Sequence, residues 1–317
     1  MLNLLVVIIN YKTPELTSQA VLSVIPQLNE KDKICLIDNL SEDNSIDFLT
    51  KFIKNNKFKN KVNLIASPIN GGFSAGNNIG IKSAEAAYYL LLNSDAYLKE
   101  NAIEQLINKI KESTSIGVVA PQLIWEDGKQ QTSCFNYLTP SNTFLNTANT
   151  GFISRLFHLL NINEVAIPFD QHKSTKPEWL SFACILLRGN LIQDIGLMDE
   201  GYFMYYEDMD YCHRANMAGW TLSYEHDARV VHLNQGASNQ VTIKRLPRFY
   251  FNSRRRYFLK FHGYLGLVLA NLNWSIGRVI SLFREKIESK PPLCHKTMYM
   301  DIWTGFFTSI HEGQNEK

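Results

Sequence analysis

The chain has 317 residues, enough for one large domain with an appendage or for two modest domains. Hydrophobic residues make up 45% of the sequence and charged residues 20%, which excludes a wholly disordered protein. The net charge of +2 hides an asymmetry, because residues 241–317 contain 13 Lys and Arg against 5 Asp and Glu. The first 240 residues therefore carry a formal charge of −6 and the remainder +8. Such a distribution suits an enzyme docked on an anionic surface, and equally a tail that solvates itself.

Neither the cysteines nor the N-terminus indicates a secreted protein. The five cysteines are odd in number and scattered, without a Cys-x-x-Cys pair, so we expect reduced, mostly buried thiols in a cytosolic protein. The apolar N-terminus lacks a basic leader and a cleavage site, and we interpret it as a first buried strand. The apolar stretch 264–276 is predicted to be too short, and too interrupted by Asn271 and Asn273, to span a bilayer.

Short apolar runs alternate with helical patterns along the first part of the chain. Strands are predicted over residues 4–9, 34–37, 62–66, 88–92 and 117–122, and helices from residue 14, over 45–53, from the glycine-rich segment 70–78 to residue 87, and over 101–111. Repeated strand–helix units predict an α/β fold with a mainly parallel sheet flanked by helices.

The pattern fails between residues 127 and 177, which are rich in Asn, Thr and Ser and are predicted to form a long loop region. Loops of this length in a compact domain usually serve as lids or mobile segments. After it, the sequence predicts a strand over 179–187, a helix near 204–218 and two short strands at 221–224 and 228–232. We place a catalytic domain in residues 1–240.

The remaining residues, 241–317, are predicted to form a basic, amphipathic helical region. Apolar residues recur there at helical spacing from Phe258 to Ile287. Cations alternate with aromatic residues around Arg254, Arg255 and Arg256, which is compatible with nucleic-acid binding, with a helix on a membrane surface, or with a helix packed on the catalytic domain. The charge asymmetry favours peripheral membrane contact, and no nucleic-acid partner is expected.

Polar residues follow the predicted parallel strands at the edge where open sheets bind ligands. Asn10 and Tyr11 follow the first strand, Asp38 and Asn39 the second, residues 70–78 the third, and Asp95 the fourth. An aromatic ring can stack on a base, a carboxylate can accept from a base or a ribose hydroxyl, and glycine permits close approach of the backbone. Each residue alone is more often a turn or a cap, but the ordered set favours a nucleotide site. The glycine segment follows the third strand and lacks the G-x-G-x-x-G spacing, which disfavours a dinucleotide-dependent dehydrogenase.

Several of these segments resemble family 2 glycosyltransferases of the GT-A fold, most closely the rhamnosyltransferase-like branch. The resemblance lies in residues 7–12, 38–43, 70–80, 92–95 and 198–214, and in His232. It implies the nucleotide-diphospho-sugar transferase fold, with a helical C-terminal extension here. It also implies transfer of L-rhamnose from dTDP-rhamnose to a cell-surface polysaccharide or lipid-linked saccharide, in the cytoplasm at the inner face of the cytoplasmic membrane. A UDP-sugar-dependent hexosyl or N-acetylhexosaminyl transferase of the same fold and a non-catalytic nucleotide-sugar-binding scaffold are the alternatives.

The resemblance further implies a divalent cation, Mg²⁺ or Mn²⁺, at a DxD-type motif that offsets the charge of the diphosphate leaving group. In this sequence only the last position of that motif is acidic, so Asp95 is the expected metal ligand, with His232 as the second. Asn93, at the first position, is expected to contact the ribose or a water molecule.

The resemblance places the catalytic base in a Glu-Asp pair at a helix start, here Glu207 and Asp208. Asp208 is expected to take the proton of the acceptor hydroxyl, while Glu207 holds the acceptor or orients the loop. Two packed carboxylates should titrate abnormally. Asp210 is expected to pair with Arg214 instead. With no separate nucleophile in view, we expect inversion.

The residues expected to contact the nucleotide sugar are Asn10, Tyr11, Asp38, Asn39, Asn70, Gly72, Asn77, Asn78, Asn93 and Trp179. The oligomeric state cannot be inferred from the sequence.

Overall fold

The structure is a computed structural model that describes residues 2–149, 155, 157, 159, 162–168, 176–233, 245–289, 292 and 294–304. The chain divides into two compact units. The first unit comprises Met1–Phe135, Pro168–Phe203 and Glu207–Ser238, and the second comprises Asn136–Ile167, Met204–Tyr206 and Asn239–Lys317. The predicted boundary between residues 240 and 241 stays a prediction, but residues 136–167 group with the C-terminal part of the chain.

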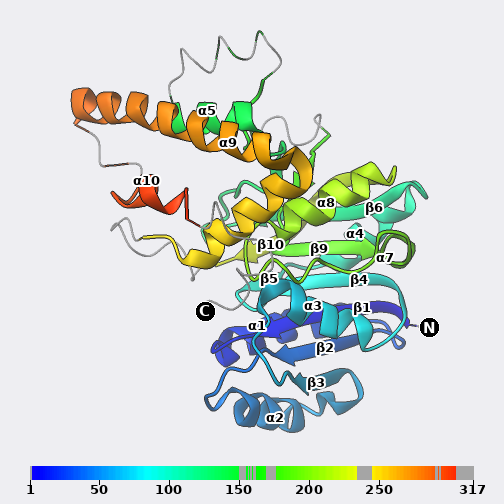
Figure 1. Cartoon of the computed structure of the whole chain (residues 1–317). Helices are drawn as coiled ribbons and strands as arrows, with labels where there is room; N and C mark the ends of the chain where they lie inside the picture. The colour runs from blue at the N-terminus through cyan, green and yellow to red at the C-terminus, as the bar shows by residue number, and fades with distance from the viewer. Residues whose placement is uncertain are drawn as a thin grey trace. The chain divides into compact units, whose positions relative to one another are not determined.

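An eight-stranded sheet with the strand order β3-β2-β1-β4-β9-β6-β10-β5 forms the centre of the first unit (Figure 1). Its strands are β1 (Leu2–Asn10), β2 (Lys33–Asp38), β3 (Val62–Ala66), β4 (Ala86–Asn93), β5 (Ala96–Leu98), β6 (Ile116–Ile124), β9 (Cys184–Arg188) and β10 (Thr221–His232). Strands β3, β2, β1 and β4 pair in parallel, as do β6 and β10. Strand β9 runs antiparallel to β4 and β6, and β5 runs antiparallel to β10. The predicted mainly parallel sheet is confirmed.

Helices cover the sheet because its central strands are apolar on both faces. In β1 the five successive residues from Leu4 to Ile8 are at most 2% exposed, as expected for a strand buried on both sides. The helices of this unit are α1 (Pro14–Val24), α2 (Ser45–Asn55), α3 (Gly72–Lys82), α4 (Ala102–Lys111), α7 (Gly189–Ile195) and α8 (Glu207–Met217), with short 3₁₀ turns η1 (Ile25–Gln27) and η2 (Phe58–Asn60). Pro14 begins α1 as predicted.

Two predicted strand assignments were wrong. Residues 179–187 form two strands instead of one, because β8 (Trp179–Leu180) leaves the main sheet to pair with β7 (Cys134–Phe135), while β9 joins the main sheet. The two short strands predicted at 221–224 and 228–232 form one strand, β10, with a register shift between Glu225 and Arg229. This register shift is a β-bulge, which explains why the hydrophobic pattern is interrupted between the two predicted strands.

The glycine-rich segment was predicted to precede a helix reaching residue 87. Helix α3 instead begins inside that segment at Gly72 and ends at Lys82, and β4 begins at Ala86. Glycine is a poor helix former, so the start of α3 depends on tertiary contacts that are described below.

In the second unit, a helix lies within the segment predicted to be a long loop. Helix α5 (Pro140–Ala148) begins with a capping box, in which the Thr139 hydroxyl accepts from the Asn142 N–H and the Asn142 side chain accepts from the Thr139 N–H. The usual signature has Glu or Gln at the third helical position. Asn at that position concealed the helix start.

Helix α9 (Arg248–Glu288) dominates the second unit, which also contains the short α10 (Met298–Asp301). Its backbone departs from helical geometry at Gly263, where φ is 66°. Helix α5 packs beside α9 (Figure 1), and Asn273 donates to the Pro140 carbonyl over 2.9 Å. In length and composition α9 could cross a membrane, although 44% of its apolar window is buried within the structure. The expectation that residues 264–276 do not span a bilayer stays a prediction.

Candidate active site

The strand ends that carry the predicted nucleotide-binding residues lie in register at one edge of the sheet. Asn10 of β1 is opposite Asp38 of β2, and Asp38 is opposite Ala66 of β3. On the other side of β1, Ile9 is opposite Asn93 of β4. The parallel pairing therefore brings polar residues from sequence positions far apart to one edge, as the sequence predicts.

Asp38 is 3% exposed and its carboxylate is held by a local network. Asn10 Nδ2 and Ser41 Oγ donate to its Oδ1 over 2.7 and 2.6 Å, and the Ser41 N–H donates to its Oδ2 over 3.1 Å. Asn10 is itself fully buried, and its Oδ1 accepts from the Thr17 hydroxyl. Asn10 therefore orients Asp38. Ser41 and Thr17 were not singled out in the sequence because nothing local shows which carboxylate they support.

Tyr11 differs from these buried neighbours, since its side chain is 45% exposed at the end of β1. The Lys12 ammonium lies 5.2 Å from the ring centroid. An exposed ring with a cation beside it can stack on a flat ligand.

The start of the glycine segment is joined by hydrogen bonds to the residue that follows β2 and to the loop before α8. Asn39 Nδ2 donates to Asn70 Oδ1 over 2.9 Å and to the Gly72 carbonyl over 3.1 Å. Gly72 has a φ of +83°, and a Cβ there would lie 2.0 Å from the carbonyl oxygen of Phe203. The Phe73 N–H donates to that same oxygen over 2.8 Å. Glycine is required at position 72 because backbone of the loop occupies the space of a side chain.

Asn77 and Asn78 are buried in α3, and their side chains form hydrogen bonds with groups other than Asp38. Asn77 donates to the Phe73 carbonyl over 3.1 Å. Asn78 donates to the Met198 carbonyl and to Glu200, and accepts from the Met198 N–H. Asn78 thereby fixes the start of the loop that leads to α8.

The two predicted metal ligands lie together although 137 positions separate them in the sequence. Asp95 stands in the turn between β4 and β5, and His232 ends β10, which pairs with β5. His232 Nε2 lies 3.5 Å from Asp95 Oδ1, with both side chains largely buried. The Leu233 N–H donates to the Asp95 carbonyl over 2.9 Å. We call these two residues the Asp95–His232 pair.

Gln131 orients the histidine of this pair. Its Oε1 lies 3.2 Å from His232 Nδ1, and its Nε2 donates to the His232 carbonyl over 2.6 Å. If Nδ1 carries the proton and donates to Gln131, the lone pair of Nε2 faces Asp95. Gln131 lies in the segment predicted to be a loop, and no local signal links it to a residue 101 positions away.

The Asp95–His232 pair fits a divalent cation. Two ligands of one Mg²⁺ or Mn²⁺ ion, each about 2.1 Å away, lie about 3 Å apart, close to the 3.5 Å observed. A histidine ligand that donates its other ring N–H to a fixed acceptor is the usual arrangement at metal sites. Among the described residues no cluster of three or more His, Cys, Asp or Glu is suited to a metal. A cation here would therefore need water or substrate oxygens as further ligands.

Phe182 and Ala183, between β8 and β9, connect the Asp95 turn to the Glu207–Asp208 pair. The Ala183 carbonyl accepts from the Asn93 N–H over 3.0 Å. The Phe182 N–H lies close enough to the carboxylate of Asp208 to lower its pKa. Asp208 and the end of β4, two residues before Asp95, thus both lie against the segment Phe182–Ala183. The side-chain oxygen of Asn93 is buried and has no partner among the described residues.

Glu207 and Asp208 begin α8 and have perturbed acidities. Burial raises the pKa of Glu207 well above its ordinary value, and the neighbouring Asp208 raises it further. Burial also raises the pKa of Asp208 to about 6, although the Met209 and Phe182 N–H groups donate to it and oppose the rise. One buried oxygen of Glu207 has no partner within the described part of the chain. The expectation that these carboxylates titrate abnormally is supported.

The remaining carboxylate of this helix is structural. Arg214 Nε donates to Asp210 Oδ1 over 2.8 Å, and the Tyr202 hydroxyl donates to Asp210 Oδ2 over 3.1 Å. The other guanidinium nitrogens of Arg214 donate to the carbonyls of Ile195 and Leu197. The predicted Asp210–Arg214 pair is confirmed.

Trp179 stacks on Phe135 across the small sheet, with ring centroids 4.1 Å apart and planes 12° from parallel. Their strands pair through Cys134 and Leu180. All five cysteines are free and four are buried, as expected.

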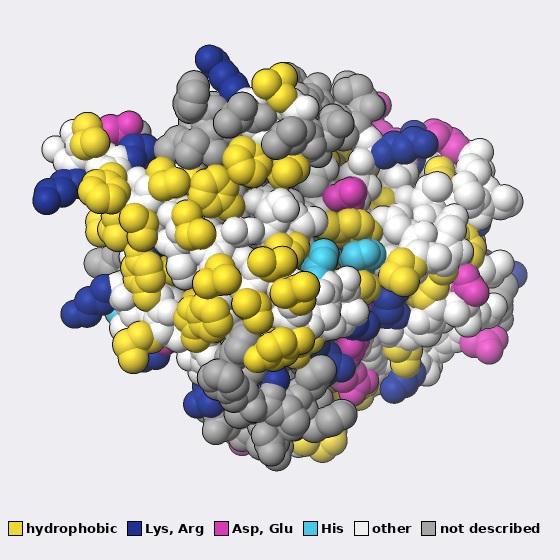
Figure 2. Space-filling model, turned by 45° about the horizontal axis from the view of Figure 1, so that its top comes forward, with side chains coloured by type: hydrophobic (Ala, Val, Ile, Leu, Met, Phe, Trp, Pro, Cys, Tyr) yellow, Lys and Arg dark blue, Asp and Glu magenta, His cyan; other side chains and the backbone are white. Residues whose placement is uncertain are grey.

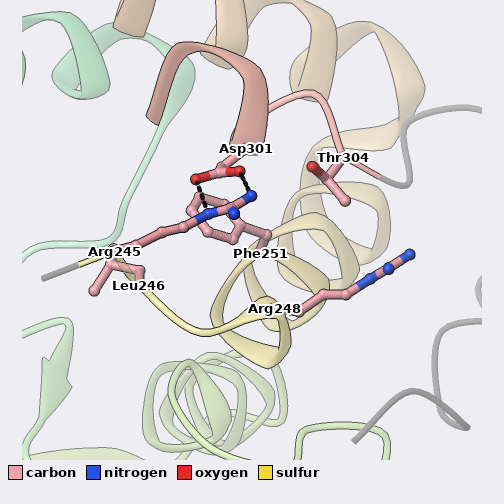
Figure 3. Close-up of a pocket in the computed structure, with 6 residues that line it drawn as sticks. All are labelled: Arg245, Leu246, Arg248, Phe251, Asp301 and Thr304. Atoms are coloured by element: carbon pink, nitrogen blue, oxygen red, sulfur yellow. Dashed lines mark hydrogen bonds and ion pairs between the residues drawn. The ribbon is translucent and has the colours of Figure 1, made fainter. Parts of the chain in front are cut away.

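A cavity of about 380 Å³ lies in the second unit (Figure 3) and holds none of the predicted site residues. Arg245 points at Asp301 and binds it through two hydrogen bonds, while Arg248 extends away from them. A guanidinium already paired with a carboxylate has little charge left for an anionic ligand.

Residues 5–158 match the family described as Glycosyl transferase family 2. The chain is 23% identical over 304 residues to the low-salt glycan biosynthesis hexosyltransferase Agl10 of Haloferax volcanii, covering 92% of this chain and 88% of the relative. It is 26% identical over 220 residues to the rhamnosyltransferase WbbL of Escherichia coli, covering 67% and 76%. Among solved structures it is similar to GalNAc-T7 with UDP, GalNAc and Mn²⁺, with a TM-score of 0.59 and 16% identity over 96% of this chain and 58% of the other.

The sheet, its helices and the structural similarity show the GT-A fold. Residues 5–158 match glycosyl transferase family 2, and the chain is a glycosyltransferase. The fold and enzyme class expected from the sequence are confirmed, and the match over residues 5–158 supports the expected family resemblance.

Proposed function

We propose that this glycosyltransferase inverts the anomeric centre of its donor, uses a divalent metal, and transfers L-rhamnose from dTDP-L-rhamnose to a cell-surface polysaccharide or a lipid-linked saccharide. The observation that carries the proposal is that Asp208 and the end of β4, which leads to Asp95, both lie against one segment, Phe182–Ala183. A base and a group suited to the diphosphate are then attached to the same support. The similarity to the rhamnosyltransferase WbbL supports rhamnose as the sugar.

In the proposed reaction, Asp208 accepts the proton of the acceptor hydroxyl while the hydroxyl oxygen bonds to the anomeric carbon. The bond from that carbon to the diphosphate oxygen breaks, and the electron pair leaves with the nucleoside diphosphate. A pKa of about 6 keeps Asp208 ionised at neutral pH and yet basic enough to accept a proton. The pKa of Glu207 is raised well above its ordinary value by burial and by the neighbouring Asp208. A single displacement of this kind inverts the anomeric centre.

Asp95 and His232 would hold Mg²⁺ or Mn²⁺, which supplies positive charge next to the diphosphate when bound. Gln131 keeps the His232 ring in the orientation that directs Nε2 toward Asp95. The presence of Mn²⁺ in the solved GalNAc-T7 complex supports a metal at this fold.

For the nucleotide, Asp38 would accept from the base or the ribose, and the exposed ring of Tyr11 would stack on the base. The buried, unpartnered Oδ1 of Asn93 is an acceptor for a ribose hydroxyl. Trp179, stacked on Phe135, would offer a flat face to a sugar ring. The other expected contacts shape this edge: Asn10, Asn39, Asn70, Gly72, Asn77 and Asn78.

A second candidate is transfer of another hexose or an N-acetylhexosamine from a UDP-sugar. It is favoured by the relative Agl10, named a hexosyltransferase, whose similarity covers 92% of this chain against 67% for WbbL. The two candidates share the same chemistry and differ in the donor.

We further propose that the enzyme works in the cytoplasm at the inner face of the membrane, with peripheral contact through residues 241–317. The charge of +8 in that region supports attraction to anionic lipids.

The experiment that tests the function is a thermal-shift panel of dTDP-, UDP- and GDP-sugars with and without Mn²⁺, followed by measurement of nucleoside diphosphate release in the presence of acceptor. A donor that binds the native state raises the melting temperature. The expected result is a rise with dTDP-L-rhamnose that depends on the metal, and release of dTDP. A rise only with UDP-sugars would establish the second candidate. Donor binding without any release would show a non-catalytic scaffold and overturn the proposal.

A further inference from the structure

After Gly263, helix α9 has its apolar side facing outward. Every residue from 264 to 283 that is classed as exposed is apolar. These eight residues are Tyr264, Leu265, Leu269, Leu272, Ile276, Val279, Leu282 and Phe283. We call them the outer stripe of α9. Figure 2 shows hydrophobic side chains gathered over this part of the molecule. The spacing of these residues in the sequence predicts an amphipathic helix but does not indicate which side faces inward.

The inward side of the same stretch carries Leu267 and Trp274 together with several small and polar residues. Asn271, Arg278, Ser281 and Glu285 are buried. Arg278 donates to Ser281 over 2.7 Å and to Glu285 over 3.0 Å, so the buried charges are paired. The helix is thus reversed relative to an ordinary surface helix, whose polar side faces water.

The close fit of α9 on α5 explains why small residues point inward. A Cβ on Gly277 would lie 2.8 Å from the Phe144 carbonyl and 3.0 Å from the Ala148 nitrogen. The helix cannot turn its stripe toward α5 without losing this contact. The apolar residues are therefore held outward by the packing of the inner side.

We propose that the outer stripe of α9 is a lipid-binding surface, on which the protein lies against a bilayer with the helix axis in the membrane plane. This specifies the membrane contact proposed above and rests on that proposed location, but not on the sugar or on the chemistry. A continuous apolar stripe of this size is rare on a monomer that meets only water. From Tyr264 to Phe283 it is about 30 Å long at 1.5 Å per residue.

The charges around the stripe fit a lipid surface. Exposed Lys286 lies three residues after Phe283, and exposed Lys260 lies four residues before Tyr264, across the break in helical geometry at Gly263. Lysines at the ends of an apolar stripe can reach headgroup phosphates while the stripe enters the acyl chains. The formal charge of +8 on residues 241–317 is attracted to an anionic bilayer and repels the same region of a second copy. The stripe therefore suits an anionic bilayer better than a second copy.

The helix lies on the bilayer and does not cross it. A spanning helix alone in lipid would be apolar all round, whereas α9 buries Arg278 and Glu285 on the side that packs in the second unit. Only one side of α9 is apolar and exposed, as in an interfacial helix.

The arginines that the sequence suggested for lipid contact do not all face outward. Arg254 is 4% exposed, donates to Asn271 Oδ1 over 2.6 Å, and lies 4.7 Å from the centroid of Phe258. Replacing Arg254 would disturb the packing of α9, so such a variant would not test membrane contact.

The test is co-flotation of the full chain, without donor, with vesicles of phosphatidylglycerol and phosphatidylcholine. The variant L272Q/I276Q removes two stripe residues that are 46% and 55% exposed. The matched control L22Q/M217Q removes two apolar residues of the first unit that are 46% and 74% exposed. We expect wild type and control to float with the vesicles and L272Q/I276Q to bind at least about tenfold more weakly, because two buried aliphatic side chains are lost from the lipid.

A second pair, L265Q/F283Q, gives an independent measurement if the first variant melts at a lower temperature than wild type. Wild type that does not float, or stripe variants that float as well as the control, would overturn the proposal. So would light scattering that shows a wild-type dimer and a monomeric L272Q/I276Q, since the stripe would then join two copies. Donor turnover on a water-soluble acceptor is expected to persist in the stripe variants. If the wild-type protein floats with the vesicles but shows no donor turnover, the proposed function is refuted and the proposed lipid-binding surface is not.

Discussion

Replacing Asp208 by Asn should abolish transfer and at the same time stabilise the fold. Asn has the shape of Asp and keeps an oxygen that accepts from the Met209 N–H, but it cannot accept the proton of the acceptor hydroxyl. Loss of a general base costs about 10²–10⁴-fold in rate. Donor binding should change little, because the nucleotide contacts proposed here do not include Asp208.

The gain in stability follows from the raised pKa of Asp208. The folded protein binds this proton up to about pH 6, whereas the ordinary value is 3.8. Stability contributed by protonation is full below pH 3.8 and is lost as the pH rises to about 6. The full difference corresponds to about 2–3 kcal/mol. D208N carries no such charge, so it should unfold at a higher denaturant concentration than wild type at neutral pH and lose that advantage near pH 4.

The assays are nucleoside diphosphate release and urea unfolding, each measured across pH. The wild-type kcat/KM should fall about tenfold per pH unit below pH 6. The control is D227N, which removes an exposed carboxylate of β10 and should change neither quantity. Turnover by D208N within a few-fold of wild type would refute the assignment of the base. A D208N protein less stable than wild type at neutral pH would refute the reasoning from burial.

Three further outcomes are expected. Gly72→Ala should destabilise the fold by more than about 2 kcal/mol in urea unfolding, because the new Cβ would clash with backbone atoms. The control Gly128→Ala has the same φ of +83° but open space around the Cβ, and it should cost only about 1 kcal/mol. Equal losses would show that the strain of the positive φ is the whole effect. Gln131→Ala should weaken Mn²⁺ binding in the presence of donor about 10–100-fold by calorimetry, because it releases the ring of the Asp95–His232 pair; unchanged affinity would exclude this role. Arg214→Ala should cost about 3–5 kcal/mol in the same unfolding assay by removing the cationic partner of the buried Asp210 carboxylate, and a loss under 1 kcal/mol would contradict it.

Local patterns were sufficient for the parallel half of the sheet. The continuous apolar run of β1 and the polar residue after each parallel strand can be read from neighbouring residues alone. Parallel pairing then brings Asn10, Asp38 and Asn93 to one edge whatever the loops do. This is why most of the candidate site could be located before the structure was known.

Residues that act through distant partners could not be located in this way. Gln131 matters because it meets His232, and Phe182 matters because its N–H reaches Asp208. Neither role can be inferred from hydrophobic periodicity or from residue spacing. Helix α5 was missed for a different reason, since Asn142 completes its capping box in place of the usual Glu or Gln.

The sequence by itself determined the α/β class, the strand ends that gather polar residues and the helical character of residues 248–288. Tertiary structure alone decided that residues 179–187 split between two sheets, and that α9 turns its apolar stripe outward. Periodicity records that a helix has two unlike sides, but which side is covered depends on the surface that packs against it. Here Gly277 packs against α5 and Asn271 bonds to the Ile302 carbonyl, while the outer stripe remains exposed.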